Sequence, residues 1–409
     1  MLTFGLVVIL VLTFTPYALI SRARQAVEST LPALQQTVAV QQVAPPPVHE
    51  LFDVASWYSG RGEDPSRHAM LVESIDGRHV FAAHNTEATF NPASLVKLTT
   101  SLVVLKRLGK DYRFETRVYA DGTVDKSGVL HGKLFVSGND PTFGDLSAVK
   151  IAEELDKRGI KKVTDEIVVS EEFSFNYSEK PEESAQHMAK VMKFAPKKFS
   201  VGDAPAAAPL FVLRSYPLRE ILLYMNAHSV NFVAEHLGAL VGGPEGVRRF
   251  LVEDLKLPAE QVWLSTTSGL EHNRMTARGL LTVIRALNDE ANRQGLKLED
   301  IMAVASDDWG TLRNRLIGTP LEGAVVGKTG TLVHDDGGMA SLGGAVFTQK
   351  EGMVFFVVFN QGSGVAESRA MTDELLVQVV MSQDIPAIIQ RPEERRHLLE
   401  SADLIIAEQ

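Results

Sequence analysis

Ser94-Leu95-Val96-Lys97 is the first of three short motifs that predict the fold of this chain, and Ser229-Val230-Asn231 and Lys328-Thr329-Gly330 follow it in order. Each motif alone is weak evidence, because such short patterns arise by chance in 409 residues. Together they supply a nucleophilic hydroxyl, an amine to activate it, a second hydroxyl with an amide, and a cationic strand that can hold a carboxylate. This combination indicates acyl transfer through a serine ester.

Ser94 begins a helical pattern directly after Asn91-Pro92-Ala93, where the proline interrupts the preceding strand pattern. Unpaired backbone N–H groups and the helix dipole at such a start favour a developing anion. Lys97 lies three residues further on, on the same helix face, so its amine can reach the Ser94 hydroxyl. The apolar residues that follow predict the burial that lowers a lysine pKa and makes the amine a useful base. Taken alone, the motif is more simply explained as a capping serine with a surface lysine.

Ser229 and Asn231 are two positions apart and therefore do not share a helix face. We expect them in a loop that joins two helices, with both side chains directed to one site. There Ser229 would relay a proton between Lys97 and the leaving nitrogen, and Asn231 would bind the substrate amide. A polar turn between helices is the plain alternative for this motif taken alone.

The third motif lies in an apolar stretch that predicts a strand. Alternation places Lys328 and Gly330 on one side and Thr329 on the other. On an edge strand, the free backbone would pair with an extended peptide substrate. Lys328 or Thr329 would then bind a terminal carboxylate, Gly330 would permit close approach, and the N–H of Thr331 would join that of Ser94 in an oxyanion hole.

Several other classes of protein are excluded. Residues 323–329 resemble a phosphate-binding loop, but three residues separate the glycines instead of four, and no helical pattern follows. The chain has no Gly-x-Ser-x-Gly elbow and no His-Glu-x-x-His zinc motif among its 11 histidines, so we expect neither a metal nor a cofactor. A net charge of −10 argues against a nucleic-acid partner, and the absence of cysteine excludes disulfides and thiol catalysis.

The N-terminal segment predicts export. Residues 2–20 form an uncharged, mostly apolar run that is followed by Arg22 and Arg24. A small-x-small pattern at residues 21–23 favours cleavage as a secretory signal, although no basic residue precedes the run. An uncleaved anchor is the alternative, with membrane association through residues 2–20, because the run is almost long enough to span a bilayer. In an anchored form, the positive charges of Arg22 and Arg24 would keep the following domain in the cytoplasm, which conflicts with the predicted chemistry. We therefore expect export to a periplasmic or other extracytoplasmic location, with or without an anchor.

The apolar patterning predicts an α+β fold. A hairpin around Asp76-Gly77 and three apolar strands between residues 324 and 359 would form one antiparallel sheet from both chain ends, covered by helices. Short strand patterns and one helix pattern indicate an inserted α/β module between the first two motifs. The expected divisions are a signal peptide or membrane anchor at 1–24, a Pro/Gln-rich linker at 25–50, a main domain at 51–110 and 206–385, the inserted accessory module at 111–205, and a peripheral C-terminal tail at 386–409.

These motifs and their surroundings resemble the low-molecular-mass class C penicillin-binding proteins, the D-alanyl-D-alanine carboxypeptidase/endopeptidases. The resemblance extends from about residue 53 to residue 380, and the matching segments follow the order of that family. The segments are residues 91–98, 138–142, 228–235, 268–270, 310–312 and 327–332.

The resemblance implies the penicillin-binding protein/β-lactamase-like transpeptidase fold, with a five-stranded antiparallel sheet flanked by helices in the main domain. It implies a serine D,D-peptidase that acts on peptidoglycan stem peptides and is inhibited by β-lactams. On the matching positions, Ser94 would be the acylated nucleophile and Lys97 its base. Ser229 and Asn231 would assist proton transfer and binding, and Lys328 with Thr329 would grip the substrate carboxylate.

The sequence departs from the pattern of this family in two respects, and two alternative functions remain open. The stretch between Ser94 and Ser229 is short for the family, and residues 138–140 are poorer in glycine, which leaves substrate selection open. A β-lactamase is one alternative. However, class A β-lactamases need a deacylating glutamate in a Glu-x-x-x-Asn motif, and none follows Ser229 at a plausible distance. Class C β-lactamases have tyrosine in the place of Ser229. A non-catalytic peptidoglycan-binding relative is the other, and the three intact motifs argue against it.

Overall fold

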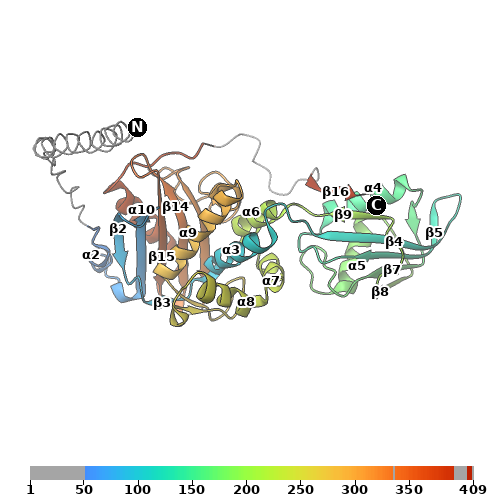
Figure 1. The fold of residues 1–409 in the computed structure, drawn as a ribbon, viewed down its shortest axis with the longest axis horizontal. Coiled ribbons are helices and arrows are strands. Elements are labelled where there is room, and N and C mark those ends of the chain that lie inside the picture. Colours follow the sequence, from blue (N-terminus) through green and yellow to red (C-terminus); the bar gives the residue numbers. More distant parts are fainter. Residues whose placement is uncertain (1–50, 335–336, 391–402, 408–409) are drawn as a thin grey trace, which may run out of the picture. The chain divides into compact units, whose positions relative to one another are not determined.

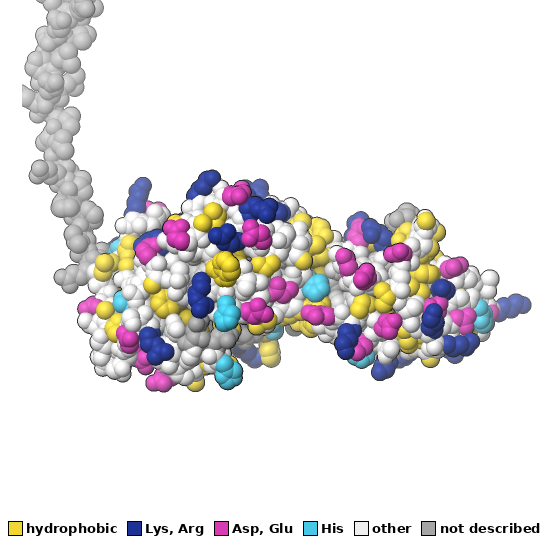
Figure 2. Space-filling view, turned by 90° about the horizontal axis from the view of Figure 1, so that it is seen from below, with side chains coloured by type: hydrophobic (Ala, Val, Ile, Leu, Met, Phe, Trp, Pro, Cys, Tyr) yellow, Lys and Arg dark blue, Asp and Glu magenta, His cyan; other side chains and the backbone are white. Residues whose placement is uncertain are grey.

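A computed structural model of the protein describes residues 51–334, 337–390 and 403–407. The predicted signal or anchor segment, the linker up to residue 50 and part of the predicted tail lie outside the described residues. Within the described part of the chain, no helix is both long enough and apolar enough to cross a membrane. Acidic and basic side chains are interspersed over the face of the molecule shown in Figure 2.

The largest structural unit is built on an antiparallel sheet with the strand order β12-β13-β14-β15-β1-β2. Its strands come from both ends of the chain, as the sequence predicts. They are β1 (His68–Ser74), β2 (Val80–His84), β12 (Ala303–Val304), β13 (Val325–Leu332), β14 (Met339–Phe347) and β15 (Met353–Gln361). The predicted five strands are present, and the two-residue β12 adds a sixth at one edge. A strand this short carries no alternating pattern, so the sequence does not show it.

Both faces of this sheet are covered, which explains why its central strands are continuous apolar runs. In β15, Phe355, Val357 and Phe359 pack into the core cluster that also contains residues of helices α3 (Val96–Leu108) and α9 (Ala277–Arg293). Phe356 and Val358, on the opposite face, pack with helix α10 (Val365–Met381). Helix α9 runs across the strands in Figure 1. Strands buried on both faces lose the polar alternation of a half-exposed sheet.

The remaining elements of this unit are mostly short and helical. A small three-stranded sheet has the order β10-β11-β3, and its strand β3 precedes the Ser94 motif in the sequence. The elements are α2 (Val54–Ser59), β3 (Thr89–Phe90), α6 (Leu218–His228), α7 (Asn231–Ala239), α8 (Gly243–Arg249), a single π-helical turn at Phe250–Asp254, β10 (Val262–Trp263) and β11 (Arg274–Thr276).

A second, seven-stranded mixed sheet is built mainly from the chain between the first two motifs. Its strands are β4 (Glu115–Val124), β5 (Val129–Ser137), β6 (Lys162–Val163), β7 (Glu166–Val169), β8 (Lys198–Val201), β9 (Phe211–Arg214) and β16 (Ile405–Ala407), and its helices are α4 (Asp145–Lys157) and α5 (Pro181–Val191). Strands β5, β7 and β8 are parallel neighbours.

The module around this sheet differs from the sequence prediction in its boundaries and in one helix. Strand β9 lies beyond residue 205, where the module was expected to end, and β16 of the expected peripheral tail pairs with β9 as an edge strand. Helix α5 was not predicted, because only four of its residues are buried and its apolar stripe is narrow. Its start carries a recognisable signal, since Pro181 occupies the first turn and Glu182 and Glu183 follow it.

Candidate active site

Ser94 lies in the single 3-10 turn Ala93–Leu95, immediately before α3 begins at Val96. Ala93 has a positive φ of 49°, which is uncommon for a residue with a side chain. Two hydrogen bonds hold this turn in place. The N–H of Ala93 donates to Asn91 Oδ1 at 3.1 Å, and the Ser341 hydroxyl of β14 donates to the carbonyl of Pro92 at 2.9 Å. The nucleophile therefore stands on a turn that the surrounding structure fixes.

Two glycines allow other segments to approach this turn. Gly269 has a φ of +88°, and a Cβ there would lie 1.9 Å from the carbonyl oxygen of Ala93. A Cβ on Gly330 of β13 would lie 2.7 Å from the carbonyl oxygen of Pro92. These separations are shorter than any side-chain carbon tolerates, so both positions require glycine. The absence of a side chain at Gly330 brings the β13 strand against the nucleophile turn.

Lys97 is fully buried, and its amine makes three hydrogen bonds. The Nζ atom lies 3.1 Å from Ser94 Oγ, 2.6 Å from Asn231 Oδ1 and 2.6 Å from the carbonyl oxygen of Ser268. Burial lowers the pKa of Lys97 to about 7, against the opposing influence of the Glu235 carboxylate, which favours the charged amine. A large fraction of Lys97 is therefore neutral near pH 7 and able to accept a proton.

Glu235 of α7 organises the segment that contacts Lys97 from the other side. Its carboxylate accepts hydrogen bonds from the Thr267 hydroxyl at 2.7 Å and from the Ser268 N–H at 2.9 Å. The carbonyl of Ser268 in turn accepts from Lys97. Glu235 and Ser268 lie in segments of the sequence that match the family, but no role for them is predicted from the sequence. The signal that was missed is a lone carboxylate on the same short helix as Asn231.

Ser229 and Asn231 flank a junction between two helices, as predicted. Ser229 ends α6 in the left-handed conformation, with φ 57° and ψ 41°, and Asn231 is the first residue of α7. Ser229 Oγ accepts a hydrogen bond from Lys328 Nζ at 2.9 Å, whereas Asn231 contacts Lys97. The junction thus connects the two lysines, one through each of its polar side chains.

Lys328 of β13 is completely buried and also donates to the carbonyl of Thr329 at 2.7 Å. Burial, together with the nearby charge of Lys97, lowers the pKa of Lys328 well below its ordinary value. The proximity of the two buried amines disfavours the state in which both are charged. A ligand carboxylate near Lys328 would compensate the repulsion.

Strand β13 has a free backbone edge next to this cluster. The N–H of Ala305 donates to Val325 on the β12 side, and the N–H of Phe347 donates to Ala324 on the β14 side. Because backbone groups alternate along a strand, the N–H and C=O groups of Thr329 and Thr331 point away from β14. Strand β12 pairs only as far as Gly327. Beyond the end of β12, the backbone of Thr331 and the N–H of Thr329 can pair with an extended ligand, whereas the carbonyl of Thr329 accepts the hydrogen bond from Lys328.

The side chains of Thr329 and Thr331 contact two further segments. Thr329 Oγ1 donates to Thr311 Oγ1 at 2.8 Å, and the N–H of Thr311 donates to the carbonyl of Ala227 at the end of α6. Thr331 Oγ1 accepts from Arg369 of α10 at 2.9 Å. Arg369 is not predicted from the sequence, because it lies in a segment without a motif.

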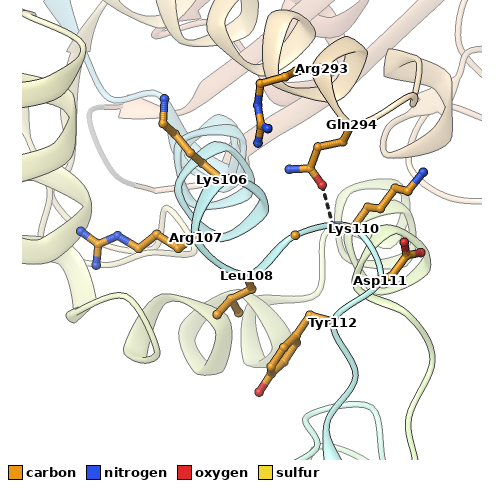
Figure 3. Close-up of a pocket in the computed structure, with 9 residues that line it drawn as sticks. Lys106, Arg107, Leu108, Lys110, Asp111, Tyr112, Arg293 and Gln294 are labelled. Carbon is orange, nitrogen blue, oxygen red and sulfur yellow. Dashed lines mark hydrogen bonds between the residues drawn. The ribbon is translucent and has the colours of Figure 1, made fainter.

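The pocket drawn in Figure 3 is a different place on the molecule. It has a volume of about 550 Å³ and lies at the C-terminal end of α3. Its residues are Lys106, Arg107, Leu108, Gly109, Lys110, Asp111, Tyr112, Arg293 and Gln294. A rise of about 1.5 Å per residue places Lys106 roughly 13 Å from Lys97 along the helix, so this pocket is separate from the candidate active site. The described residues contain no group of three or more His, Asp or Glu side chains that could hold a metal ion.

Comparisons with known proteins identify the family and the fold. A model of the D-Ala-D-Ala carboxypeptidase 3 (S13) family matches residues 62–190 and 196–379. The fold is similar to that of Bd3459, a predatory peptidoglycan endopeptidase from Bdellovibrio bacteriovorus, with 22% identity and a TM-score of 0.69 over 83% of this chain and 98% of that one. It is also similar to penicillin binding protein 4 (dacB) from Haemophilus influenzae, with 19% identity and a TM-score of 0.60 over 75% of this chain and 96% of that one. At these identities the two solved structures show a shared fold.

Proposed function

The chain belongs to the D-Ala-D-Ala carboxypeptidase 3 (S13) family and is a serine peptidase, and from this premise we propose which residues carry its chemistry. Ser94 is the nucleophile and Lys97 its base. Ser229 assists proton transfer, Asn231 holds Lys97 and the substrate amide, and Lys328 with Thr329 binds the carboxylate of the leaving residue. The observation that carries the proposal is the hydrogen bond of 3.1 Å between the buried Lys97 amine and Ser94 Oγ.

Acylation begins with neutral Lys97, which takes the proton of Ser94 while Oγ attacks the carbonyl carbon of the scissile amide. The carbonyl oxygen becomes an oxyanion, which the N–H groups of Ser94 and Thr331 stabilise. The free edge of β13 supports this assignment, because the alternation of its backbone directs the Thr331 N–H away from β14. Gly330 keeps that edge close to the nucleophile turn.

The proton then moves to the leaving nitrogen so that the amide bond can break. Lys97 is the donor, and the Ser229 hydroxyl relays the proton to the leaving nitrogen. This hydroxyl is hydrogen-bonded to Lys328. The amine leaves and an ester between Ser94 and the acyl group remains. Water attacks that ester, Lys97 accepts a proton from the water, and the carboxylic acid product is released with the Ser94 hydroxyl restored.

Substrate binding and base strength are coupled through the two lysines. A substrate carboxylate beside Lys328 favours its ammonium form, and this positive charge disfavours the ammonium form of Lys97. The bound substrate therefore keeps Lys97 neutral at the moment when a base is needed. Because the ammonium form of Lys328 attracts a carboxylate, the site binds an anion more strongly than a neutral peptide end.

The substrates and the place of action follow from the same chemistry. The proposed substrates are peptidoglycan stem peptides that end in D-alanyl-D-alanine or are cross-linked through D-alanine, and β-lactams are the expected inhibitors. A penicillin G-acylated form of the endopeptidase Bd3459 supports this assignment by analogy of fold. Such substrates lie outside the cytoplasmic membrane, so we place the enzyme there, with residues 1–24 as its signal or anchor.

The proposed domain division is a peptidase domain that carries the three motifs and an accessory module between the first two. The separate strand orders of the two large sheets support this division, with β13 in one and β4 to β9 in the other. The pairing of β16 with β9 supports the assignment of residues 405–407 to the module.

Covalent labelling tests the assignment of Ser94. We expect fluorescent penicillin to attach to the purified protein, and peptide mass spectrometry to find the adduct on Ser94. Ser94→Ala should abolish the label and D-alanine release from a pentapeptide stem. An intact protein that is neither labelled nor able to release D-alanine would refute the proposed function. Rapid turnover of a chromogenic cephalosporin would instead identify a β-lactamase.

A further inference from the structure

Trp309 is an unusual residue for its position. Its side chain is 60% exposed, although tryptophan is among the side chains that gain most from burial. It lies two residues before Thr311, whose hydroxyl accepts the hydrogen bond of Thr329 in the carboxylate site. Two residues of chain span at most about 7 Å, so Trp309 is a close neighbour of that site.

The segment that carries Trp309 is fixed to the body of the enzyme. Gly310 has a φ of +126°, and a Cβ there would lie 2.2 Å from the carbonyl oxygen of Ala227. Thr311 donates its N–H to the same carbonyl at 2.9 Å. This close contact with the end of α6, two residues before Ser229, holds the exposed indole beside the site.

Arg313 completes a flat polar and aromatic surface next to the indole. Its guanidinium carbon lies 3.2 Å from the centre of the Trp309 ring system, which is a cation–π stack. Arg313 is itself exposed. Stacking restricts both side chains in a common orientation, so the pair offers an ordered surface that can contact apolar and anionic groups of a ligand.

The chemistry of the site determines which part of the substrate reaches this surface. The scissile carbonyl lies at Ser94 and Thr331, and the carboxylate of the leaving residue lies at Lys328 and Thr329. Moving from Thr331 to Thr329 and on to Thr311 therefore leads to the leaving-group side. A terminal D-alanine ends there with a methyl group, whereas a cross-linked substrate continues into a second stem peptide.

We propose that Trp309 and Arg313 form a subsite for the second stem peptide of a cross-linked substrate, which makes cleavage of cross-links the activity that this site favours. The inference rests on the proposed function, since it assumes the same direction of the bound substrate along β13. It assigns a specificity role to two residues that lie outside the three motifs. The amide bond cleaved is the same one, with a second stem peptide in place of free D-alanine as the leaving amine.

The test compares two substrates with one acyl donor, a pentapeptide monomer and a D-alanine-cross-linked dimer. Trp309→Ala should lower kcat/KM for the dimer roughly tenfold or more, as truncation of an aromatic anchor commonly does, and change D-alanine release from the monomer less than about twofold. Arg313→Ala should lower only the dimer reaction, by a smaller factor. The rate of penicillin acylation should stay unchanged in both variants.

Two further variants serve as controls. Trp263→Ala removes a tryptophan of similar exposure, 62%, on β10, and should leave both reactions unchanged. Val333→Ala changes an exposed residue beyond the opposite end of the β13 motif, on the acyl side that both substrates share, so any effect should be equal for the two. Equal losses for both substrates in Trp309→Ala, or no loss in either, would overturn the subsite while penicillin labelling of Ser94 left the proposed function standing. A wild-type enzyme that is not labelled would overturn the function itself.

Discussion

The two ends of helix α3 hold lysines in opposite surroundings. At the N-terminal end, Lys97 is fully buried and hydrogen-bonded to Ser94, Asn231 and Ser268. At the C-terminal end, Lys106 is exposed at the rim of an open, cation-lined pocket (Figure 3). The first lysine has a pKa lowered to about 7 by burial. Lysine on one helix is therefore a base at one end and an exposed side chain at the other, according to what packs around it.

Replacing the Lys97 amine by a side chain that stays protonated should have the greatest effect on catalysis. Lys97→Arg should lower the rate of Ser94 acylation by about a thousandfold or more, because a guanidinium cannot be deprotonated near neutral pH. Lys106→Arg should change the rate less than twofold. Stopped-flow acylation by a chromogenic penicillin measures both variants, and circular dichroism checks that each is folded. A Lys97→Arg enzyme with near-normal acylation would show that Lys97 is not the base.

The second effect concerns stability, because burying an amine has a cost. The pKa of Lys97 is lower in the folded state than in the unfolded state, so between about pH 7 and pH 10 the unfolded chain binds the extra proton. Stability therefore rises with pH in this window, by up to about 1.4 kcal/mol per pH unit from this group.

Urea unfolding of wild type and Lys97→Met at pH 7, 8 and 9 measures that slope. The free energy of unfolding should rise more steeply with pH in the wild type than in Lys97→Met, by the contribution of Lys97. The slope for Lys106→Met should equal that of the wild type. Parallel slopes for the wild type and Lys97→Met would mean that the buried amine keeps an ordinary pKa.

The third effect concerns Glu235, which acts on Lys97 both through its charge and through the hydrogen bonds that position the neighbouring segment. Glu235 favours the charged amine, so Glu235→Gln should lower the pKa of Lys97 and move the acid limb of the acylation rate to lower pH. Glu235→Ala should also lose the hydrogen bonds to Thr267 and Ser268, and with them roughly tenfold in rate. A pH–rate profile of both variants distinguishes the two roles. A Gln variant whose limb moves to higher pH would contradict the proposed electrostatics.

How much the sequence could predict differs between these regions for a physical reason. Ser94 and Lys97 are one helical turn apart, so their contact follows from local geometry. Likewise, the helix junction at Ser229 follows from the mismatch of its spacing with a helix face. The positions of Thr311, Ser341 and Arg369 depend on which distant segments meet, and no local pattern records that. Helix α5 and the two-residue β12 were missed because their apolar patterns are too weak or too short.

The boundaries of the inserted module show the same limit. Strand β9 reads locally as an apolar run in front of α6, and β16 as an isolated apolar triplet near the chain end. Strand β9 joins the second sheet by pairing with β4, where Glu115 lies opposite Arg214, and β16 joins it by pairing across nearly 200 residues, between Ile405 and Arg214. Pairing at that separation is decided by tertiary packing rather than by local propensity.

The smallest effect tests whether the exposed end of α3 influences the buried end at all. Two unit charges about 13 Å apart in water interact by about 0.3 kcal/mol, which corresponds to roughly 0.2 pH units. Lys106→Gln removes one positive charge, so it should raise the pH midpoint of acylation by about that amount at low salt. At 0.5 M salt the shift should vanish, because exposed charges at this distance are screened. A shift that persists at high salt would mean that the coupling passes through the buried interior of the helix, and the two ends of α3 would then not be independent.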